Sequence, residues 1–424
     1  MIKRFCMLCS LLFILSGCDD LTRLNQRAIV QAIGIDYIEE LDLFKLSLLV
    51  FAPEGGGGPT SIDPSKSNSK IISSTGKSQS EALKNATLLQ GKTLFLGDAR
   101  LVLLGRSAAE TKLRHIIGFF NTTPETQSDI AFATTNNTAE SIIKLSLSQG
   151  LTPVDVFSNL LEKTSLHGKG ISSKLLDVSQ DYLSSTMSPV LPVIEIHRDD
   201  FFDQKKFNET LYSDIDPTKE NDTLDETEKD ENSTTSTLPE EIETLTKLKL
   251  TGSAVFLGGN LVGYLDEYES RGIALIRNEV TRTIYQAKTD CIESGTLRLY
   301  DPHAEINLVK DSDPLTLSVD IKSNATLLGV TAPHGSKRIC DTDIIELTEA
   351  VERLIYKECH DVIYKVTRIY DSDVFHFGDT IWKQNPELWV QIKDNYSNVL
   401  QEIEVDVNVD VNINRIGLEY PYEF

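Results

Sequence analysis

The clearest structural signal in this 424-residue chain is the stretch EIEVDVNVDVNI, residues 402–413. Its even-numbered residues are acids or asparagines, and its odd-numbered residues are all valine or isoleucine. Because successive side chains of a β-strand point to opposite faces, this alternation predicts a strand with one buried and one solvated face. Asp406, Asn408 and Asp410 also imitate half of a calcium loop, but valine and glycine stand where that loop requires glycine and glutamate. We therefore expect a strand here.

The residues before this strand predict an α+β arrangement. Residues 249–256 and 261–265 are apolar runs on either side of Gly258-Gly259-Asn260, which predicts a β-hairpin because these residues tolerate positive φ. The other expected elements are a helix at 269–276, strands at 280–285, 305–309 and 315–321, and a long helix from a capping box at Asp343 and Glu346 through Ile355.

Strand and helix patterns alternate in the first half of the chain. The expected strands are 28–35, 41–51, 71–74, 99–104 and 130–134, and the expected helices are 81–90, capped by Ser80, 108–119 and 139–147. Elements of this size in this order predict a mixed α/β layer domain. The whole chain is thus expected to be a multidomain protein of the α+β or mixed α/β class, with mixed sheets and packed helices.

An acidic segment separates the two halves. Residues 199–247 contain sixteen acidic and five basic side chains, and apolar residues are sparse there. Such a segment buries too little apolar surface to offset the entropy of ordering, so we expect a linker that is disordered at its centre, about 214–238; a charged exposed helix is the alternative. The expected parts are a signal peptide over 1–17, an N-terminal mixed α/β domain of one or two subdomains over 18–198, the acidic linker over 199–247 and a C-terminal α+β domain over 248–424.

The first residues indicate export and lipid attachment. Lys3 and Arg4 precede an apolar stretch at 5–15 that is too short to span a membrane, as in a secretory signal. Leu15, Ser16 and Gly17 then lead to Cys18, a pattern that resembles a bacterial lipobox, in which the cysteine receives a diacylglycerol and becomes the new N-terminus. The alternative is an ordinary signal peptide with a chance cysteine. We expect Cys18 to anchor the protein to a membrane surface through lipid.

The net charge and the sequence motifs exclude several classes of function. With 41 basic and 64 acidic residues the net charge is −23, which repels nucleic-acid phosphates and excludes nucleic acid as an expected partner. Nucleophile-elbow, zinc-helix, phosphate-loop and dinucleotide-binding patterns do not occur. Cys340, Cys359 and His360 are a possible metal constellation, but no Cys-x-x-Cys pair supports it, and buried structural cysteines are the stronger expectation. We expect no enzymatic activity, no metal and no cofactor.

Six segments, collinear along the chain, form a set. They are CDDLTRLN at 18–25, AIVQAIGID at 28–36, GKTLFLG at 91–97, GSAVF at 252–256, LVGYLDEYESRG at 261–272 and DVFHFG at 373–378. Together they resemble the Ger(x)C spore germination lipoproteins. The resemblance implies the C subunit of a GerA-type nutrient germinant receptor. It further implies a position on the outer face of the inner spore membrane, assembly with two integral membrane subunits of the A and B types, and no catalysis.

The segment Leu265–Gly272 is the candidate interface, because the strongest C-terminal match centres on it. It packs Asp266, Glu267, Glu269 and Arg271 into six positions. We expect a contact or transmission surface in which no residue performs chemistry. The alternative is a solvated helix start in which Glu269 and Arg271 only serve the cap.

Two functions from other classes remain open. A solute-binding lipoprotein that feeds a transporter should show two lobes closing on one polar cleft. A lipid-anchored hydrolase of envelope polymer should show a carboxylate pair, or a nucleophile with its base, in a groove.

Overall fold

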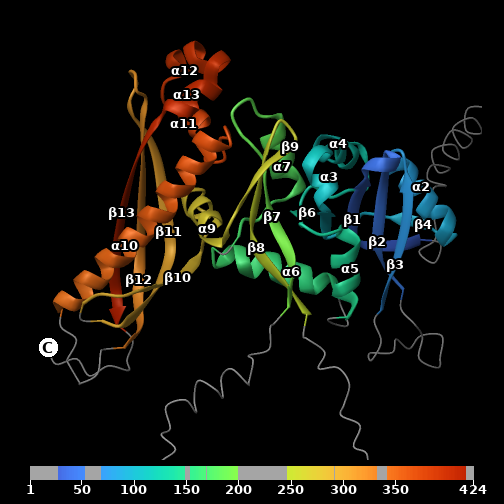
Figure 1. Cartoon of the computed structure of the whole chain (residues 1–424), viewed down its shortest axis with the longest axis horizontal. Coiled ribbons are helices and arrows are strands. Elements are labelled where there is room, and N and C mark those ends of the chain that lie inside the picture. Colours follow the sequence, from blue (N-terminus) through green and yellow to red (C-terminus); the bar gives the residue numbers. More distant parts are fainter. Residues whose placement is uncertain are drawn as a thin grey trace, which may run out of the picture. The chain divides into compact units, whose positions relative to one another are not determined.

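The computed structural model describes residues 27–52, 68–148, 153–168, 170–198, 246–290, 292–331 and 341–416. The described residues up to Glu195 and from Leu250 onward belong to one compact unit. Ile196–Lys249 forms a second unit, of which only 196–198 and 246–249 are described. The strands of the described residues form two sheets with helices packed on them (Figure 1), which confirms the predicted fold class.

The larger sheet has nine strands in the order β3-β2-β1-β5-β6-β7-β8-β9, with β4 paired to the start of β1. The strands are β1 (Arg27–Ile38), β2 (Leu43–Phe51), β3 (Ser69–Gly76), β4 (Thr93–Phe95), β5 (Leu101–Leu104), β6 (Ala131–Thr134), β7 (Val190–Arg198), β8 (Thr246–Leu257) and β9 (Asn260–Leu265). Strands β1, β5, β6 and β7 run parallel, whereas β1–β2, β2–β3 and β8–β9 are antiparallel pairs. The sheet therefore takes strands from both sides of the acidic segment.

Helices cover both faces of the parallel part of this sheet. They are α2 (Gln79–Gln90), α3 (Arg106–Thr111), α4 (Leu113–Thr122), α5 (Ala139–Ser148), α6 (Pro153–Leu166) and α7 (Leu175–Leu183). On one face, Ile33 and Val102 share a core with α2, α3, α4 and α7. On the other face, a Cβ added at Gly34 would lie 3.1 Å from the Cβ of Ala139 in α5. All four residues of β5 are buried, as expected for a parallel strand covered on both sides.

Two details of the predicted N-terminal helices are wrong. Ser78, not Ser80, caps α2, because the Ser78 side chain accepts a hydrogen bond of 3.2 Å from the backbone N of Glu81. The single helix expected at 108–119 is two helices, α3 and α4, since the backbone leaves the helical conformation at Lys112, with φ −119° and ψ 4°.

The short strand β4, the helices α6 and α7 and the strand β7 were not predicted. Helix α6 begins with Pro153, which is a favourable first helical residue. Strand β7 contains Pro192, a residue that usually argues against an interior strand.

The predicted hairpin is confirmed. Gly258 and Gly259 connect β8 to β9 with φ values of 59° and 87°, a left-handed conformation that glycine adopts without steric cost. The chain then enters α9 (Glu267–Ile276), the expected helix, at Asp266.

The smaller sheet has four strands in the order β10-β11-β12-β13. They are β10 (Arg282–Ala287), β11 (Ser294–Lys310), β12 (Thr316–Thr331) and β13 (Glu404–Ile416). The first three are antiparallel, and β13 runs parallel to β12. A parallel neighbour requires a crossover, which α10 (Asp341–Tyr364), a π-helical turn η3 (Lys365–Ile369), α11 (Phe377–Gln384), α12 (Pro386–Ile392) and α13 (Tyr396–Glu402) provide.

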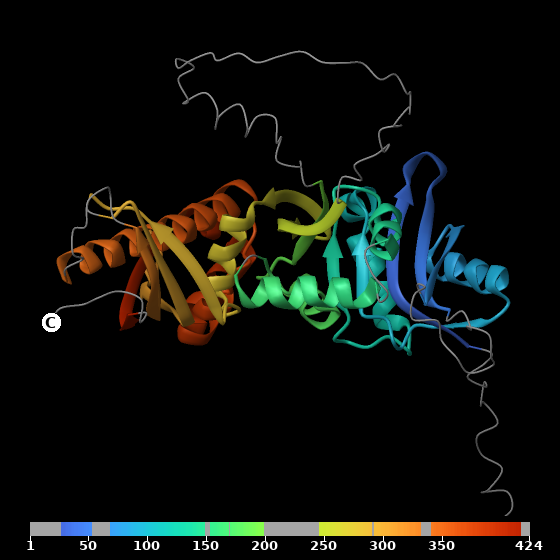
Figure 2. The same ribbon diagram turned by 90° about the horizontal axis from the view of Figure 1, so that it is seen from below.

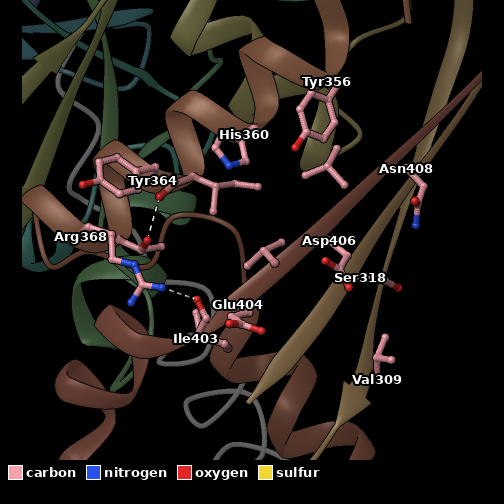
Figure 3. Close-up of a pocket in the computed structure, with 14 residues that line it drawn as sticks. Val309, Ser318, Tyr356, His360, Tyr364, Arg368, Ile403, Glu404, Asp406 and Asn408 are labelled. Carbon is pink, nitrogen blue, oxygen red and sulfur yellow. Dashed lines mark hydrogen bonds between the residues drawn. The ribbon is translucent and has the colours of Figure 1, made fainter. Parts of the chain in front are cut away.

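The period-two prediction for the last strand is confirmed. Along β13, Val407 and Val411 are buried, Val405 and Val409 are half-buried, and the even-numbered residues between them are exposed. Figure 3 shows the first residues of β13 beside α10. The strand thus turns one face to the core and the other to solvent, and the calcium-loop alternative is wrong.

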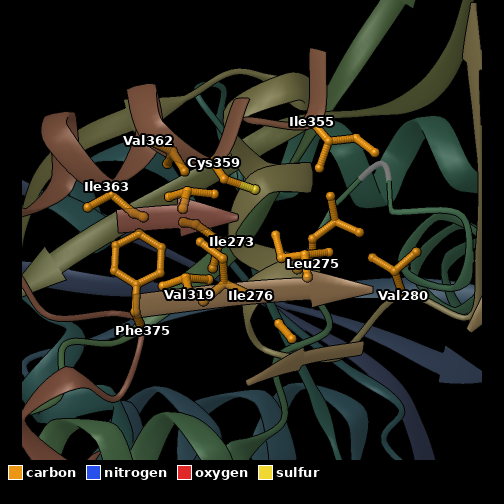
Figure 4. Close-up of a cluster of buried hydrophobic side chains, with 14 of the residues drawn as sticks. Ile273, Leu275, Ile276, Val280, Val319, Ile355, Cys359, Val362, Ile363 and Phe375 are labelled. Carbon is orange, nitrogen blue, oxygen red and sulfur yellow. The ribbon is translucent and has the colours of Figure 1, made fainter. Parts of the chain in front are cut away.

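Helices α9 and α10 supply the core of this half. Figure 4 shows Ile273 and Ile276 of α9 among Ile355 and Cys359 of α10 and Val319 of β12. Figure 2 shows α10, in orange, lying against the strands of the smaller sheet. Burial raises the pKa of the Cys359 thiol far above its ordinary value, and this cysteine is a structural core residue as expected.

Several boundaries in this half differ from the prediction. Strand β11 begins at Ser294 and β12 continues to Thr331, well beyond the expected 305–309 and 315–321. Helix α10 begins at Asp341, so Asp343 lies inside its first turn and is not the cap. Glu402 ends α13, and β13 begins two residues later than expected.

Several predictions concern residues outside the described part of the chain. They are the signal peptide, Cys18 with its lipobox, the centre of the acidic linker, Cys291 and Cys340. No helix in the described part combines the length and apolar character needed to cross a membrane.

Candidate functional site

The four candidate interface residues all lie in the first turns of α9. Asp266 is the N-cap, and its Oδ1 accepts hydrogen bonds of 2.8 Å from the backbone N atoms of both Tyr268 and Glu269. Glu269 Oε2 accepts a bond of 2.9 Å from the backbone N of Asp266, which completes a capping box. Glu267 is half-buried beside them. The local sequence thus fixes the start of the helix before any long-range contact forms.

Glu269 also binds the π-helical turn that follows α10. Lys365 Nζ lies 2.8 Å from each carboxylate oxygen of Glu269. Burial alone would lower the pKa of Lys365, but the bond to Glu269 outweighs it and raises that pKa above its ordinary value. One carboxylate therefore serves both as a cap and as an ion-pair partner.

Arg271 makes a bidentate ion pair with Glu358 of α10. Arg271 Nε donates to Glu358 Oε2 at 2.9 Å, and a terminal nitrogen of Arg271 donates to Oε1. The two side chains are only 11% and 13% exposed. Burial disfavours the charged guanidinium, yet the bonds to Glu358 raise the pKa of Arg271 above its ordinary value. Fork-to-fork geometry of this kind also fixes the relative orientation of α9 and α10.

Tyr285 of β10 closes this network. Its hydroxyl donates to Glu358 Oε2 at 2.7 Å, and the Arg271 guanidinium carbon lies 4.1 Å from the centre of its ring. Burial and the neighbouring Glu358 carboxylate raise the pKa of Tyr285 well above its ordinary value. We call Glu269, Arg271, Tyr285, Glu358 and Lys365 the α9–α10 clamp.

Gly272 allows the backbones of α9 and α10 to approach closely. A Cβ at this position would lie 2.9 Å from Glu358 O and 2.9 Å from Val362 Cγ1. The Cys359 thiol of α10 in turn points at the carbonyl of Gly272, with Sγ 4.0 Å from Gly272 O. Packing at backbone distance makes the two helices one rigid element at this point.

A pocket of about 850 Å³ lies beside the clamp. Its lining includes Asp266, Glu267, Tyr268, Glu269, Arg271, Ile284, Tyr285, Leu354, Lys357 and Glu358. Tyr268, Ile284 and Leu354 are exposed apolar side chains at this pocket. The structure thus brings all four predicted residues to one pocket, in which Glu269, Arg271 and Glu358 are held by ion pairs.

Both clamp carboxylates in this pocket are paired with cations. Its carboxylates Glu269 and Glu358 are held by cations, so neither is placed as a free general acid or base. Within the described ranges, no group of three or more histidine, cysteine, aspartate or glutamate side chains could hold a metal ion.

Sequence reasoning missed the partners of the predicted residues. Glu358 of α10 and Lys365 of η3 lie 87 and 96 residues beyond Arg271 and Glu269. No local pattern links residues at such distances. The dense charge at the start of α9 was the only sequence feature that pointed to these partners. Such charge indicates that carboxylates and cations distant in sequence pair with it in the fold.

The fold defines the class to which the chain belongs. It matches the crystal structure of the GerBC protein with a TM-score of 0.52, covering 90% of this chain and 96% of that one at 13% identity. A spore germination protein N-terminal domain model matches residues 20–196, and a Spore germination B3/GerAC-like C-terminal model matches residues 251–417.

Relatives of known sequence agree with this assignment. Spore germination protein KC of Bacillus subtilis (strain 168) is 25% identical over 439 residues, covering 98% of this chain and 97% of the relative. Spore germination protein YndF of the same organism is 27% identical over 176 residues, covering 40% and 42%. The chain belongs to the Ger(x)C family of spore germination proteins.

Proposed function

We propose that this chain is the lipid-anchored C subunit of a nutrient germinant receptor, which acts with integral membrane subunits to trigger spore germination. The observation that carries the proposal is the collinear match of both family domains, together with a germination relative aligned over nearly its whole length. A protein that shared only one domain with the family would not justify the same role.

The anchor in this proposal is a diacylglycerol on Cys18. Leu15, Ser16 and Gly17 precede it with the residue sizes of a lipobox, and a basic pair and a short apolar stretch precede them. Two acyl chains suffice for stable attachment. The lipid would hold the chain on the outer face of the inner spore membrane, where A-type and B-type membrane subunits are its partners.

The role is one of contact and transmission, without catalysis. The paired carboxylates of the α9–α10 clamp argue against acid–base work there, and the exposed apolar side chains around its pocket favour protein contact. The transporter alternative finds no support in the germination families that match. We assign Asp266, Glu267, Glu269 and Arg271 to a contact or transmission surface, with Glu269 and Arg271 acting through α10.

Spores that lack the gene provide the test. Complementation with the wild-type gene should restore nutrient-triggered germination, while Cys18→Ala should leave an unprocessed or unanchored chain that does not. Glu269→Ala and Arg271→Ala proteins that are shown to be folded and lipidated should fail to support germination or their membrane partners. Intact mass that retains residues 1–17 would refute the anchor, and normal germination without the gene would refute the receptor role.

A further inference from the structure

Strand β13 is an edge strand of the smaller sheet, and among the described residues only β12 pairs with it. Glu404 N donates to Leu315 O at 2.8 Å, which directs the backbone groups of even-numbered residues to β12. The odd-numbered residues must then face outward. Two bonds agree: Val411 N donates to Glu352 Oε1 at 2.9 Å, and Ile403 O accepts from Arg368 at 2.7 Å.

Between these two bonded positions lie three residues whose outward backbone groups are unpaired. Val405, Val407 and Val409 find no hydrogen-bond partner on this edge among the described residues. An unpaired edge of this kind is a template on which another extended chain can add as a strand.

A groove of about 670 Å³ runs along this edge. Six consecutive residues, 403–408, line it. The lining also includes Ser318 of β12 and Val309 of β11, so the groove extends from the β13 edge over the neighbouring strands. An added strand would occupy the part of the groove that lies between the β13 edge and α10.

The opposite wall of the groove is aromatic. Tyr356, His360, Tyr364 and Arg368 follow one another at intervals of four residues along α10 and η3, and all four line the groove (Figure 3). The rings of Tyr356 and His360 stack with their centres 5.6 Å apart. Tyr356 and Tyr364 are 45% and 57% exposed, so large apolar surface is available there.

The two faces of β13 differ in charge. Its odd-numbered side chains pack toward α10, and the exposed carboxylates of Glu404, Asp406 and Asp410 lie on the other face. A second copy of β13 would bring the same carboxylates against these, which destabilises a strand pair. A strand with lysine or arginine on that face would instead pair opposite charges.

We propose that the edge of β13 accepts an extended segment of a partner protein as a fifth strand, and that this segment alternates basic and apolar residues. Its basic side chains meet Glu404 and Asp406, and its apolar side chains lie against Tyr356 and Tyr364. The backbone groups of Val405 and Val407 supply the hydrogen bonds. The inference rests on the proposed function only in that a receptor subunit has protein partners.

The test measures binding of labelled peptides to the full-length, detergent-solubilised protein by fluorescence anisotropy. The probe is a peptide of about eight residues that alternates lysine and valine, and the control peptide has the same composition in two blocks. The alternating peptide should bind at least about tenfold more tightly than the block peptide. Equal binding would mean non-specific charge attraction, and the absence of binding would equally overturn the proposal.

Variants of the edge locate the peptide. Val405→Pro removes an outward N–H without touching the bonds to β12, a change that edge strands tolerate, and it should weaken binding about tenfold. Val405→Thr keeps the N–H and the shape, and it should bind like the wild type. If Val405→Pro does not fold, Glu404→Gln with Asp406→Asn should weaken binding about tenfold at low salt. Unchanged binding in a folded variant of either kind overturns the proposal.

Peptide binding is independent of germination. If the gene proves unnecessary for germination while edge-dependent binding persists, only the proposed function fails. If germination requires the gene but the alternating peptide does not bind, only this inference fails.

Discussion

The two flanks of helix α10 are built in opposite ways. Toward α9, the clamp pairs every charge it contains, and Arg271 and Glu358 are almost completely buried. Toward β13, outward backbone groups have no partner within the part of the chain that the structure describes, and the aromatic rings of Tyr356 and Tyr364 are exposed. The dense charge in the sequence at the start of α9 therefore indicated contacts that stabilise the fold. The free surface lies instead at the edge of β13, which has no second neighbouring strand among the described residues.

The π-helical turn η3 joins these two flanks. Lys365 binds Glu269 on the α9 side, and Arg368 binds the carbonyl of Ile403 at the start of β13. Turns of this type occur frequently at functional sites. A displacement of α9 would act on the β13 edge through this turn, which gives the proposed transmission role a physical route.

The largest expected effect breaks the clamp. Arg271→Met leaves the Glu358 carboxylate buried without its cation, which should cost about 3–5 kcal/mol of the free energy of unfolding. The double variant Arg271→Met with Glu358→Gln removes both charges and keeps an acceptor for Tyr285, so it should recover most of this loss. Urea denaturation of the three proteins measures the difference.

The double variant also separates structure from function. If it is stable and its spores germinate normally, the clamp only holds α9 to α10, and the interface proposal for Arg271 is refuted. If it is stable and germination fails, the charges act beyond folding.

The sequence predicted the helices and strands on the two flanks of α10. It did not predict that the flank toward α9 is paired and that the flank toward β13 is open. The alternation in 402–413 and the Gly258-Gly259 turn predict β13 and the β8–β9 hairpin because both signals are local. Nothing local shows that β8 and β9 join the larger sheet, or that β12 is the one neighbour of β13. The clamp partners Glu358 and Lys365 escaped for the same reason, since only the folded chain brings residues 87 and 96 positions apart together.

Asp181, a buried carboxyl outside the clamp, should lower the free energy of unfolding at neutral pH. Burial raises the pKa of Asp181 to about 6; Arg277 opposes the shift, and Asp177, Glu279 and Asp373 add to it. Because the folded-state pKa lies above the unfolded value, stability is full below about pH 4 and falls as pH rises through about 6. Asp181→Asn should therefore be more stable by up to about 3 kcal/mol at pH 7.5 and by only about 1 kcal/mol at pH 4.5.

Urea denaturation of both proteins at the two pH values checks this sign. A gain of equal size at both values would show that the amide acts through packing and not through the lost charge. A loss at pH 7.5 would mean that the ionised carboxylate of Asp181 is itself stabilising.

A smaller effect is expected where α9 and α10 touch through their backbones. Gly272→Ala places a Cβ 2.9 Å from Glu358 O, so a backbone must shift, at a cost of about 1–3 kcal/mol. Gly118→Ala in α4 is the matched control, because a Cβ there meets nothing within 4 Å. The control should gain about 0.5–1 kcal/mol through its higher helix propensity. Similar changes in melting temperature for both variants would contradict close packing at Gly272.

The smallest effect on stability is expected on the β13 side of α10, and it sharpens the comparison most. Tyr364 is 57% exposed and holds no part of the core, so Tyr364→Ala should change the free energy of unfolding by less than about 0.5 kcal/mol. The same variant should bind the alternating peptide less tightly, because the aromatic wall that receives its apolar side chains is lost. A stability loss as large as that of Gly272→Ala would place Tyr364 among the structural residues of α10. If peptide affinity is unchanged, the aromatic wall is not part of the docking site, and only the backbone of β13 specifies a partner.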